Sequence, residues 1–390
     1  MKKRAEVVII GGGVVGASVA FHLAERGIRD VLILEREIEQ GRGSTGAATG
    51  GVRAQFETDI NIKMSIYSID FLKNWEHDCE YDPKGYLFFA TTDEQFAYLK
   101  GNVVKQRSLG VRDVDVVDAK TIAQIVPGMN CGDITGGTFG KNDGFVNPLA
   151  IMRGLTEGAV RGGATIEFGV EVIGLNVEGG RIVSVETSKG VVECDAAVIC
   201  TGARAAEIAG TSGVDLPVLP QRRQIVWART REPMPAHLPM VIDIGTGFHF
   251  RPARDFRGGP VEPDEVLFAY PDPDEATSIR TDFEDSFIAK VYDRAKLRAD
   301  FLFESEVVHK KCRAGLYENS PDHHAILGGC DVGGLYFANG FSGHGVMHSP
   351  ATGRALSEII LDGRSSFLDV SCLSLDRFAK GELLHETAFI

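Results

Sequence analysis

A glycine-rich turn and a carboxylate near the N-terminus have the residue types and spacing of a dinucleotide-binding site. The apolar run 7–10 leads into Gly-Gly-Gly-Val-Val-Gly at 11–16, and Glu35 ends the next apolar run, 31–34. The first glycine permits a tight turn, the second lets the backbone approach a pyrophosphate, and the third lets the next helix pack on the strand. A helix predicted over 14–26 directs free N–H groups at phosphates, and an acid about 20 residues further on binds ribose hydroxyls. A purely structural glycine turn would not require the acid.

Three other stretches of small residues could approach the same ligand. The segment 41–51 favours a close wrap around a cofactor over a disordered linker. Thr-Gly-Ala at 201–203 follows the apolar strand predicted over 196–200. A glycine turn at 340–345 leads into a helix predicted over 346–361, whose first N–H groups would stabilise negative charge on a cofactor ring, unless the turn is an ordinary cap. The residues expected to contact the cofactor are Gly11, Gly13, Val14, Val15, Gly16, Glu35, Arg36, Ser44, Thr45, Ala48, Thr49, Gly50, Val172, Thr201, Gly202, Gly340, Ser342, Gly343, His344, Gly345, Val346 and Met347.

The elements that must position these residues alternate between two kinds of segment. Helical periodicity predicts helices over 58–77, 93–109, 149–161 and 282–300. Short apolar or alternating runs predict strands over 86–91, 114–117, 165–168, 170–177, 181–188, 191–194, 224–229, 247–251, 266–270, 307–316 and 334–338. The loop 252–264 is predicted to be exposed. This interleaving predicts a chain of the α/β (α+β) class with two discontinuous domains. Residues 1–84, 145–216 and 319–390 form the cofactor domain, and residues 85–144 and 217–318 form a β-rich substrate-binding or cap domain.

Composition bounds the class of protein. The chain has 390 residues, of which 44% are apolar and 24% charged, as expected of a globular protein with two domains. Its net charge of −13 disfavours binding to nucleic acids and anionic membranes, and no apolar run approaches the ~18 residues of a membrane span. The seven cysteines form no CxxC pair, so neither a zinc site nor a disulfide framework is indicated. The first strand begins so early that we expect no leader peptide and a cytoplasmic location.

The motifs occur in an order that resembles the FAD-dependent D-amino-acid oxidase superfamily over essentially the whole chain. They are the N-terminal fingerprint, Gly-Ser-Thr at 43–45, Cys-Thr-Gly-Ala at 200–203, Ser-Pro-Asp at 320–322 and the turn 340–345. The run Ala-Thr-Gly-Gly-Val-Arg-Ala-Gln-Phe at 48–56 most resembles the sarcosine oxidase β-subunit and proline dehydrogenase group. The resemblance implies a glutathione-reductase-like Rossmann FAD-binding domain with an interleaved antiparallel β-sheet substrate domain. FAD is favoured over NAD because the chain lacks a second glycine fingerprint and a redox CxxxxC motif.

The resemblance implies an oxidoreductase that oxidises the C–N bond of an amino acid or secondary amine, such as sarcosine, proline or an opine, by hydride transfer to flavin N5. An arginine fork suits the carboxylate of such a small-molecule substrate. Arg53 is the first choice, with a structural arginine as the alternative. Core packing is the alternative for Tyr317, and a structural hydrogen-bonding role is the alternative for His344. The candidates for the substrate side are Arg53, His249, Arg251, Tyr317, His344 and Met347.

Departures from the family pattern bear on the electron acceptor and on the FAD linkage. Monomeric sarcosine oxidases carry a lysine where this chain has Met347, and another lysine, which assists reaction with oxygen, has no counterpart in 266–270. This favours a dehydrogenase that passes electrons to another acceptor or to a partner subunit, in a hetero-oligomer, over an oxidase that uses O2. The cysteine tether of monomeric sarcosine oxidases matches Gly315, three residues from Cys312, and the histidine tether of dimethylglycine dehydrogenases matches the Gly46-Ala47 pair. Noncovalent FAD is the prediction.

Two other functions remain open from the sequence. The chain could be an FAD-bearing structural or assembly subunit without amine turnover, because some proteins with a similar Gly-Gly-Val-Arg-Ala-Gln-Phe run serve in complex assembly. It could also be a 2-hydroxy-acid oxidase on the same fold. Reduction of the flavin by a panel of amino acids and hydroxy acids distinguishes the three.

Overall fold

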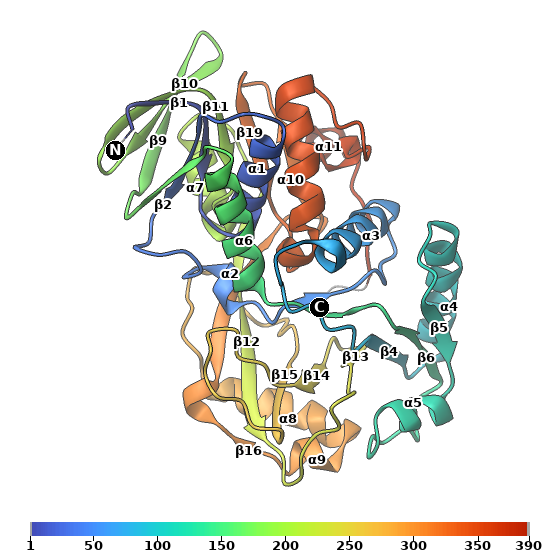
Figure 1. The fold of residues 1–390 in the computed structure, drawn as a ribbon. Coiled ribbons are helices and arrows are strands. Elements are labelled where there is room, and N and C mark those ends of the chain that lie inside the picture. Colours follow the sequence, from blue (N-terminus) through green and yellow to red (C-terminus); the bar gives the residue numbers. More distant parts are fainter. Residues whose placement is uncertain (1, 388–390) are drawn as a thin grey trace.

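Two β-sheets organise residues 2–387, the part of the chain that the computed structural model describes (Figure 1). The eight strands of the first sheet are β1 (Arg4–Ile10), β2 (Val31–Glu35), β8 (Thr165–Phe168), β9 (Val172–Glu178), β10 (Arg181–Thr187), β11 (Gly190–Ile199), β18 (Ile326–Gly329) and β19 (Leu335–Asn339). The nine strands of the second sheet are β4 (Tyr86–Ala90), β5 (Val114–Val117), β6 (Gly136–Gly140), β12 (Leu219–Arg229), β13 (Met240–Asp243), β14 (His249–Pro252), β15 (Glu265–Ala269), β16 (Glu306–Val307) and β17 (Arg313–Asn319). A short antiparallel pair consists of β3 (Gly51–Val52) and β7 (Gly144–Phe145).

Helices cover both sheets and connect them. The α-helices are α1 (Val14–Glu25), α2 (Ser44–Ala47), α3 (Asp59–Asn74), α4 (Asp93–Ser108), α5 (Ala119–Ile125), α6 (Pro148–Arg161), α7 (Ala205–Gly210), α8 (Ser286–Arg298), α9 (Asp300–Phe303), α10 (Gly345–Asp362) and α11 (Asp376–Lys380). Three 3-10 helices are η1 (Gly202–Arg204), η2 (His309–Lys311) and η3 (Ser371–Leu373). In Figure 1, α1, α6 and α10 lie together against the upper sheet, and α8 and α9 lie at the bottom of the lower one.

β1 lies between β2 and β11 in the first sheet and runs parallel to both. Its alternate side chains enter different cores, because successive residues of a strand point to opposite faces. Val7 and Ile9 pack with residues of α1, α6 and α10, whereas Val8 and Ile10 pack with residues of β9, β10 and α7. The burial of both faces explains why the sequence of β1 ends in an unbroken apolar run.

The second sheet is antiparallel, as predicted, except that β13 runs parallel to β4. Buried residues of β12, β14 and β15 pack on α8 in one core. The helix predicted over 282–300 is shorter, since Ala299 has an extended backbone that separates α8 from α9. The strand predicted over 307–316 is interrupted by η2, and the strands predicted over 191–194 and 196–200 form the single strand β11.

The chain passes back and forth between the sheets. Strands of the first sheet come from 4–35, 165–199 and 326–339, and those of the second come from 86–140 and 219–319. This alternation agrees with the α/β (α+β) class that the sequence predicted, while the domain boundaries themselves stay a prediction.

The loop 252–264 differs from its prediction, because its first half is packed instead of exposed. Ala253 is buried, and Arg254 forms an ion pair with Asp82. The ring of Phe256 comes so close to Gly50 that a β-carbon there would lie 2.8 Å from it. The loop therefore covers the segment 41–51.

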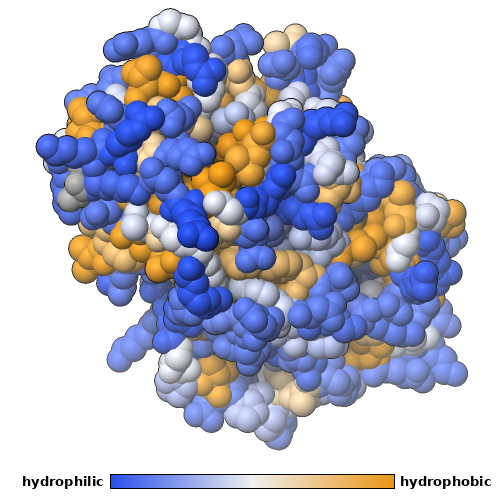
Figure 2. All heavy atoms as spheres, turned by 45° about the horizontal axis from the view of Figure 1, so that its top comes forward, coloured by the Kyte–Doolittle hydropathy of each residue, from blue (hydrophilic) through white to orange (hydrophobic). Residues whose placement is uncertain are grey.

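The outer surface is polar over most of the face in Figure 2, where hydrophobic residues form separate patches. Within residues 2–387, no helix has both the length and the apolar character needed to cross a bilayer.

Replacing Gly16 with alanine should destabilise the protein by about 1–3 kcal/mol, the usual cost of overpacking. The new β-carbon would lie 2.0 Å from the carbonyl oxygen of Gly11. Neither the helix that carries this β-carbon nor the backbone of Gly11 can easily move. The free energy of unfolding from denaturant titration measures the effect. Gly101→Ala is the matched control, because Gly101 lies in α4 with nothing within 4 Å of its added β-carbon, and that variant should gain about 0.5–1 kcal/mol. Equal stability of the two variants would contradict the prediction.

Candidate active site

A cavity of about 810 Å³ lies between the strands of the two sheets. The ends of β1, β2 and β11 line one part of it, and β12, β13, β14 and β17 line another. The segment 41–51 and the turn before α10 contribute further walls. Its volume falls within the ~300–1,000 Å³ typical of ligand sites.

The turn 11–16 brings the start of α1 to the cavity. Gly11 has a φ of +104°, and a β-carbon on it would lie 2.5 Å from the carbonyl oxygen of Cys200, so only glycine fits beside the end of β11. Gly13 occupies the N-cap of α1 without a side-chain cap, and the N–H of Val14 donates to Oγ1 of Thr45 at 3.1 Å. The predicted arrangement of strand, tight turn and helix is therefore present.

The carboxylate of Glu35 is fixed at the end of β2. One oxygen accepts a hydrogen bond from the N–H of Gly12 at 2.9 Å, and the other accepts from the N–H of Glu37 at 2.9 Å. Arg36 also lines the cavity, but its guanidinium pairs with Glu37 at 2.9 Å. The Glu35 carboxylate thus lies beside the glycine turn with acceptor capacity left for a ribose hydroxyl.

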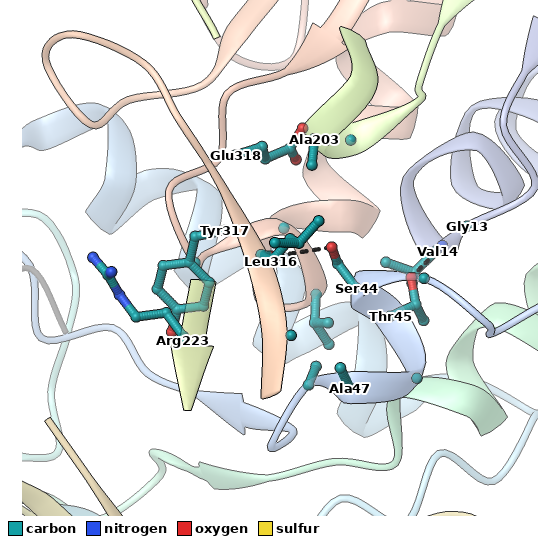
Figure 3. Close-up of a pocket in the computed structure, with 18 of the residues that line it drawn as sticks. Gly13, Val14, Ser44, Thr45, Ala47, Ala203, Arg223, Leu316, Tyr317 and Glu318 are labelled. Atoms are coloured by element: carbon teal, nitrogen blue, oxygen red, sulfur yellow. Dashed lines mark hydrogen bonds between the residues drawn. The ribbon is translucent and has the colours of Figure 1, made fainter. Parts of the chain in front are cut away.

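The segment 41–51 is ordered and forms a wall of the cavity, as its small residues predicted. Part of it is the short helix α2, and Oγ of Ser44 donates to the carbonyl oxygen of Leu316 at 2.8 Å, as shown in Figure 3. Further along, the carbonyl oxygen of Thr49 accepts a hydrogen bond from Arg251. Both contacts join the segment to strands of the second sheet.

Most residues predicted at the cofactor line the cavity. They are Gly11, Gly13, Val14, Val15, Glu35, Arg36, Ser44, Thr45, Ala48, Thr49, Gly50, Val172, Thr201, Gly202, Gly343, His344, Gly345, Val346 and Met347. Three others do not line it, so their contact with the cofactor stays a prediction. Gly16 packs behind the turn on Gly11, and Gly340 and Ser342 adopt positive φ angles of 72° and 51° within the turn before α10. Ser342 supports that turn by donating to the carbonyl of Gly340 at 3.2 Å.

Arg53 lines the cavity although it is buried. Its guanidinium donates to the carbonyl of Gln55 and, at 3.5 Å, to Nε2 of His344, and it lies 3.8 Å from the ring centre of Phe56. Desolvation lowers the pKa of Arg53, and the negative charge of Glu386 opposes that shift. The same burial, with the Arg53 charge close by, lowers the pKa of His344 well below its usual value, so this imidazole is neutral.

His249 and Tyr317 also line the cavity, whereas Arg251 does not. Nδ1 of His249 donates to the carbonyl of Gly247 at 2.8 Å, and desolvation lowers its pKa to about 4. The ring of Tyr317 packs beside Gly343, where a β-carbon would lie 2.5 Å from it. The buried guanidinium of Arg251 lies 4.5 Å from the ring centre of Phe145 and bonds to the carbonyls of Thr49 and Pro252, so its contact with a substrate stays a prediction.

Three polar residues that the sequence did not single out also line the cavity, of which Tyr86 is buried and Arg223 and Glu318 are partly buried. Arg223 lies 5.2 Å from the ring centre of Tyr317, Tyr86 lies against Gly51, and Glu318 follows Tyr317 on β17. The alternation along β12 could have indicated Arg223, because alternate residues of a strand share one face and Arg223, Ile225 and Trp227 all line the cavity. No local pattern in the sequence marked the other two.

The chain and its structure are similar to described proteins. Residues 6–359 match the family model DAO, "FAD dependent oxidoreductase". FAD-dependent oxidoreductase domain-containing protein 1 of Xenopus laevis is 32% identical over 98% of this chain and 84% of its own length. The mitochondrial dimethylglycine dehydrogenase of Rattus norvegicus is 29% identical over 97% of this chain, which spans 45% of that enzyme. The crystal structure of L-proline dehydrogenase from P. horikoshii has a TM-score of 0.88 and 26% identity, and the match covers 98% of this chain and all of that one.

These similarities confirm the fold and the cofactor that the motifs predicted, whereas the cytoplasmic location stays an expectation. The cavity fits FAD on its own geometry. The start of α1 and the glycine turn offer N–H groups for a pyrophosphate, and Glu35 offers a carboxylate for a ribose. Oγ1 of Thr201 is buried at the end of β11 without a hydrogen-bond partner among residues 2–387, as expected of a group that a ligand satisfies.

Replacing Glu35 with alanine should raise the dissociation constant of FAD about 10- to 100-fold, because a charge-assisted hydrogen bond contributes about 1.5–3 kcal/mol. Titration of the apoprotein with FAD, followed by flavin fluorescence, measures the constant. Glu39→Ala should leave it unchanged, because Glu39 is exposed and pairs with Arg42. If Glu35→Ala binds FAD as tightly as that control, Glu35 has no part in the cofactor site.

Proposed function

Because this chain belongs to the FAD dependent oxidoreductase family, we propose that it oxidises the C–N bond of an amino acid or secondary amine that carries a carboxylate. Bound FAD supplies a two-electron acceptor for hydride from the substrate carbon next to nitrogen. The residues of the chain must then hold the carboxylate and accommodate an uncharged amine.

The observation that carries this proposal is the buried guanidinium of Arg53 at the cavity wall. Phe56 stacks on one face of the guanidinium and the Gln55 carbonyl accepts one of its N–H groups, so its orientation is fixed. Burial disfavours the charged guanidinium, and an anionic substrate would offset that cost. A planar donor fork held in this way suits a carboxylate bound through two oxygens.

Two neutral imidazoles suit an amine. Because Nδ1 of His249 donates to a backbone carbonyl, Nε2 is the acceptor, and the lowered pKa keeps the ring uncharged at neutral pH. His344 is also neutral and is oriented by Arg53. Neither imidazole would repel an amine, and His249 can accept one of its hydrogens. The names of the rat and P. horikoshii proteins support this substrate class, because dimethylglycine and proline each combine an amine with a carboxylate.

The cations at the cavity support an electron acceptor other than O2. β15 carries no lysine. Within the described residues, the lysines that line the cavity are Lys310 and Lys311, and the second is committed to Glu265 at 2.7 Å. A lysine near the flavin would stabilise superoxide as it forms. The absence of a lysine from β15 therefore favours transfer of electrons to another acceptor or to a partner subunit.

Amino acids and secondary amines with a carboxylate should reduce the bound flavin when mixed anaerobically with the protein. Loss of absorbance in the flavin bands measures the reaction. Reduction by 2-hydroxy acids instead would indicate a hydroxy-acid oxidase, and reduction by neither class would favour an FAD-bearing subunit without turnover. Reoxidation by an artificial electron acceptor should be faster than reoxidation by O2.

Arg53→Ala should raise the apparent KM for an acidic substrate about 10- to 100-fold through loss of a charged hydrogen-bonded pair. Arg53→Lys should recover only part of the loss, because lysine keeps the charge but not the fork. Arg161→Ala, an exposed arginine of α6, serves as the control. An unchanged KM in Arg53→Ala would remove Arg53 from the substrate site.

Acid precipitation of the protein should release all FAD into the supernatant. The two positions that match tethers in the family lie side by side, since a β-carbon on Gly315 would be 2.7 Å from that of Ala47, and neither has a nucleophile. The thiol of Cys312 lies at the backbone of Trp227, with its sulfur 3.4 Å from the Trp227 nitrogen. Flavin absorbance that stays with the pellet would contradict noncovalent binding.

A further inference from the structure

The carboxyl group of Glu318 has no role in the site described so far. Glu318 lies at the end of β17, lines the cavity and faces the segment that contains Ala203 in Figure 3. Its Oε2 is buried and has no hydrogen-bond partner among residues 2–387. A β-carbon on Gly202 would lie 3.8 Å from that oxygen, so the group occupies the seam between β17 and η1.

No cation is paired with this carboxyl group among the described residues. It accepts hydrogen bonds from the backbone N–H groups of Gly340 and Phe341. These bonds favour the carboxylate, but desolvation outweighs them and raises the pKa of Glu318 to about 8. The group is therefore a neutral acid at pH 7, and a neutral acid carries an O–H donor.

The titratable groups on neighbouring elements do not replace the missing cation. Burial raises the pKa of Cys200, which directly follows β11, and the nearby Glu318 raises it further, so the Cys200 thiol is neutral. Arg204 of η1 pairs with Glu207 at 3.5 Å, and Arg223 of β12 lies against Tyr317. Further along the chain, Asp322 pairs with Arg377, and His344 at the start of α10 is neutral.

A second buried polar atom lies at the same place. Oγ1 of Thr201, which immediately precedes η1, also lines the cavity without a partner among residues 2–387. Each such buried group costs about 1–3 kcal/mol if it stays unsatisfied. Two of them on opposite sides of one seam, contributed by the two sheets, indicate a polar ligand segment that passes between them.

We propose that Glu318 is a positioning residue for FAD, whose neutral carboxyl group donates a hydrogen bond from Oε2 to an acceptor atom of the bound cofactor. The backbone N–H groups of Gly340 and Phe341 orient the carboxyl group. Ionisation of Glu318 removes the donor and places a negative charge beside an anionic cofactor. This role goes beyond the proposed amine oxidation and holds whatever the substrate is.

The dissociation constant of FAD, measured on the apoprotein at pH 7 and pH 9, tests this role without any substrate. If FAD binds the protonated form, the constant should rise about tenfold between these two pH values, because the group titrates near pH 8. Glu318→Gln keeps an N–H donor that does not titrate, so its constant should stay within about twofold between the two pH values. Glu318→Ala has no donor and should bind more weakly at pH 7, again without dependence on pH.

Glu207→Gln is the matched control, because Glu207 also lines the cavity but is exposed and paired with Arg204. In this variant the dissociation constant of FAD should rise about tenfold between pH 7 and pH 9, as in the unchanged protein. A constant that does not change between pH 7 and 9 in the unchanged protein overturns the proposal. So does an equal rise in Glu318→Gln, which would place the titrating group elsewhere. If Glu318→Ala fails to fold, the comparison with Glu318→Gln decides alone.

Discussion

The contact between the backbone of Gly16 and the carbonyl of Gly11 is the constraint on which the rest of the site depends. The absence of a side chain lets α1 start directly against the end of β1, with its free N–H groups at the cavity. The same turn lies on the carbonyl of Cys200, which fixes the end of β11 and thereby Thr201 and η1. The segment 41–51 also meets this corner, because the N–H of Val14 donates to Thr45.

β17 transmits that constraint to the second sheet. Its successive residues contact different walls of the cavity: Gly315 lies against Ala47, the Leu316 carbonyl accepts from Ser44, and Tyr317 packs beside Gly343. Glu318 and Asn319 then meet the turn before α10. A single strand of the second sheet therefore contacts both the segment 41–51 and the turn 340–345. A displacement of β17 would therefore change both of these cavity walls together.

Local patterns in the sequence were sufficient where a structure is built from neighbouring residues. The first strand, turn, helix and acid were predictable because their spacing is fixed by one βαβ unit, and Glu35 lies where this spacing placed it. Contacts between distant strands left no such trace. Arg251 was predicted at the substrate because its strand borders the site, but whether its side chain enters the cavity depends on Thr49 and Phe145, which are far away in the sequence. Glu318 was missed for the same reason, since its burial comes from η1 and from the turn before α10.

The electrostatic character of the cavity differs from that of the whole chain. A net charge of −13 disfavours polyanionic partners at the surface, where charges act at long range. Inside, Arg53, Arg223 and Arg313 line the wall, and desolvation lowers the pKa of each. Glu318 is neutral, so it does not cancel them. Because short-range charges dominate in a desolvated space, these arginines support the proposal that the cavity binds a substrate carboxylate. Under that proposal, an amino acid is a better match for the cavity than an amine without an acid group, because only the amino acid brings a carboxylate to these cations.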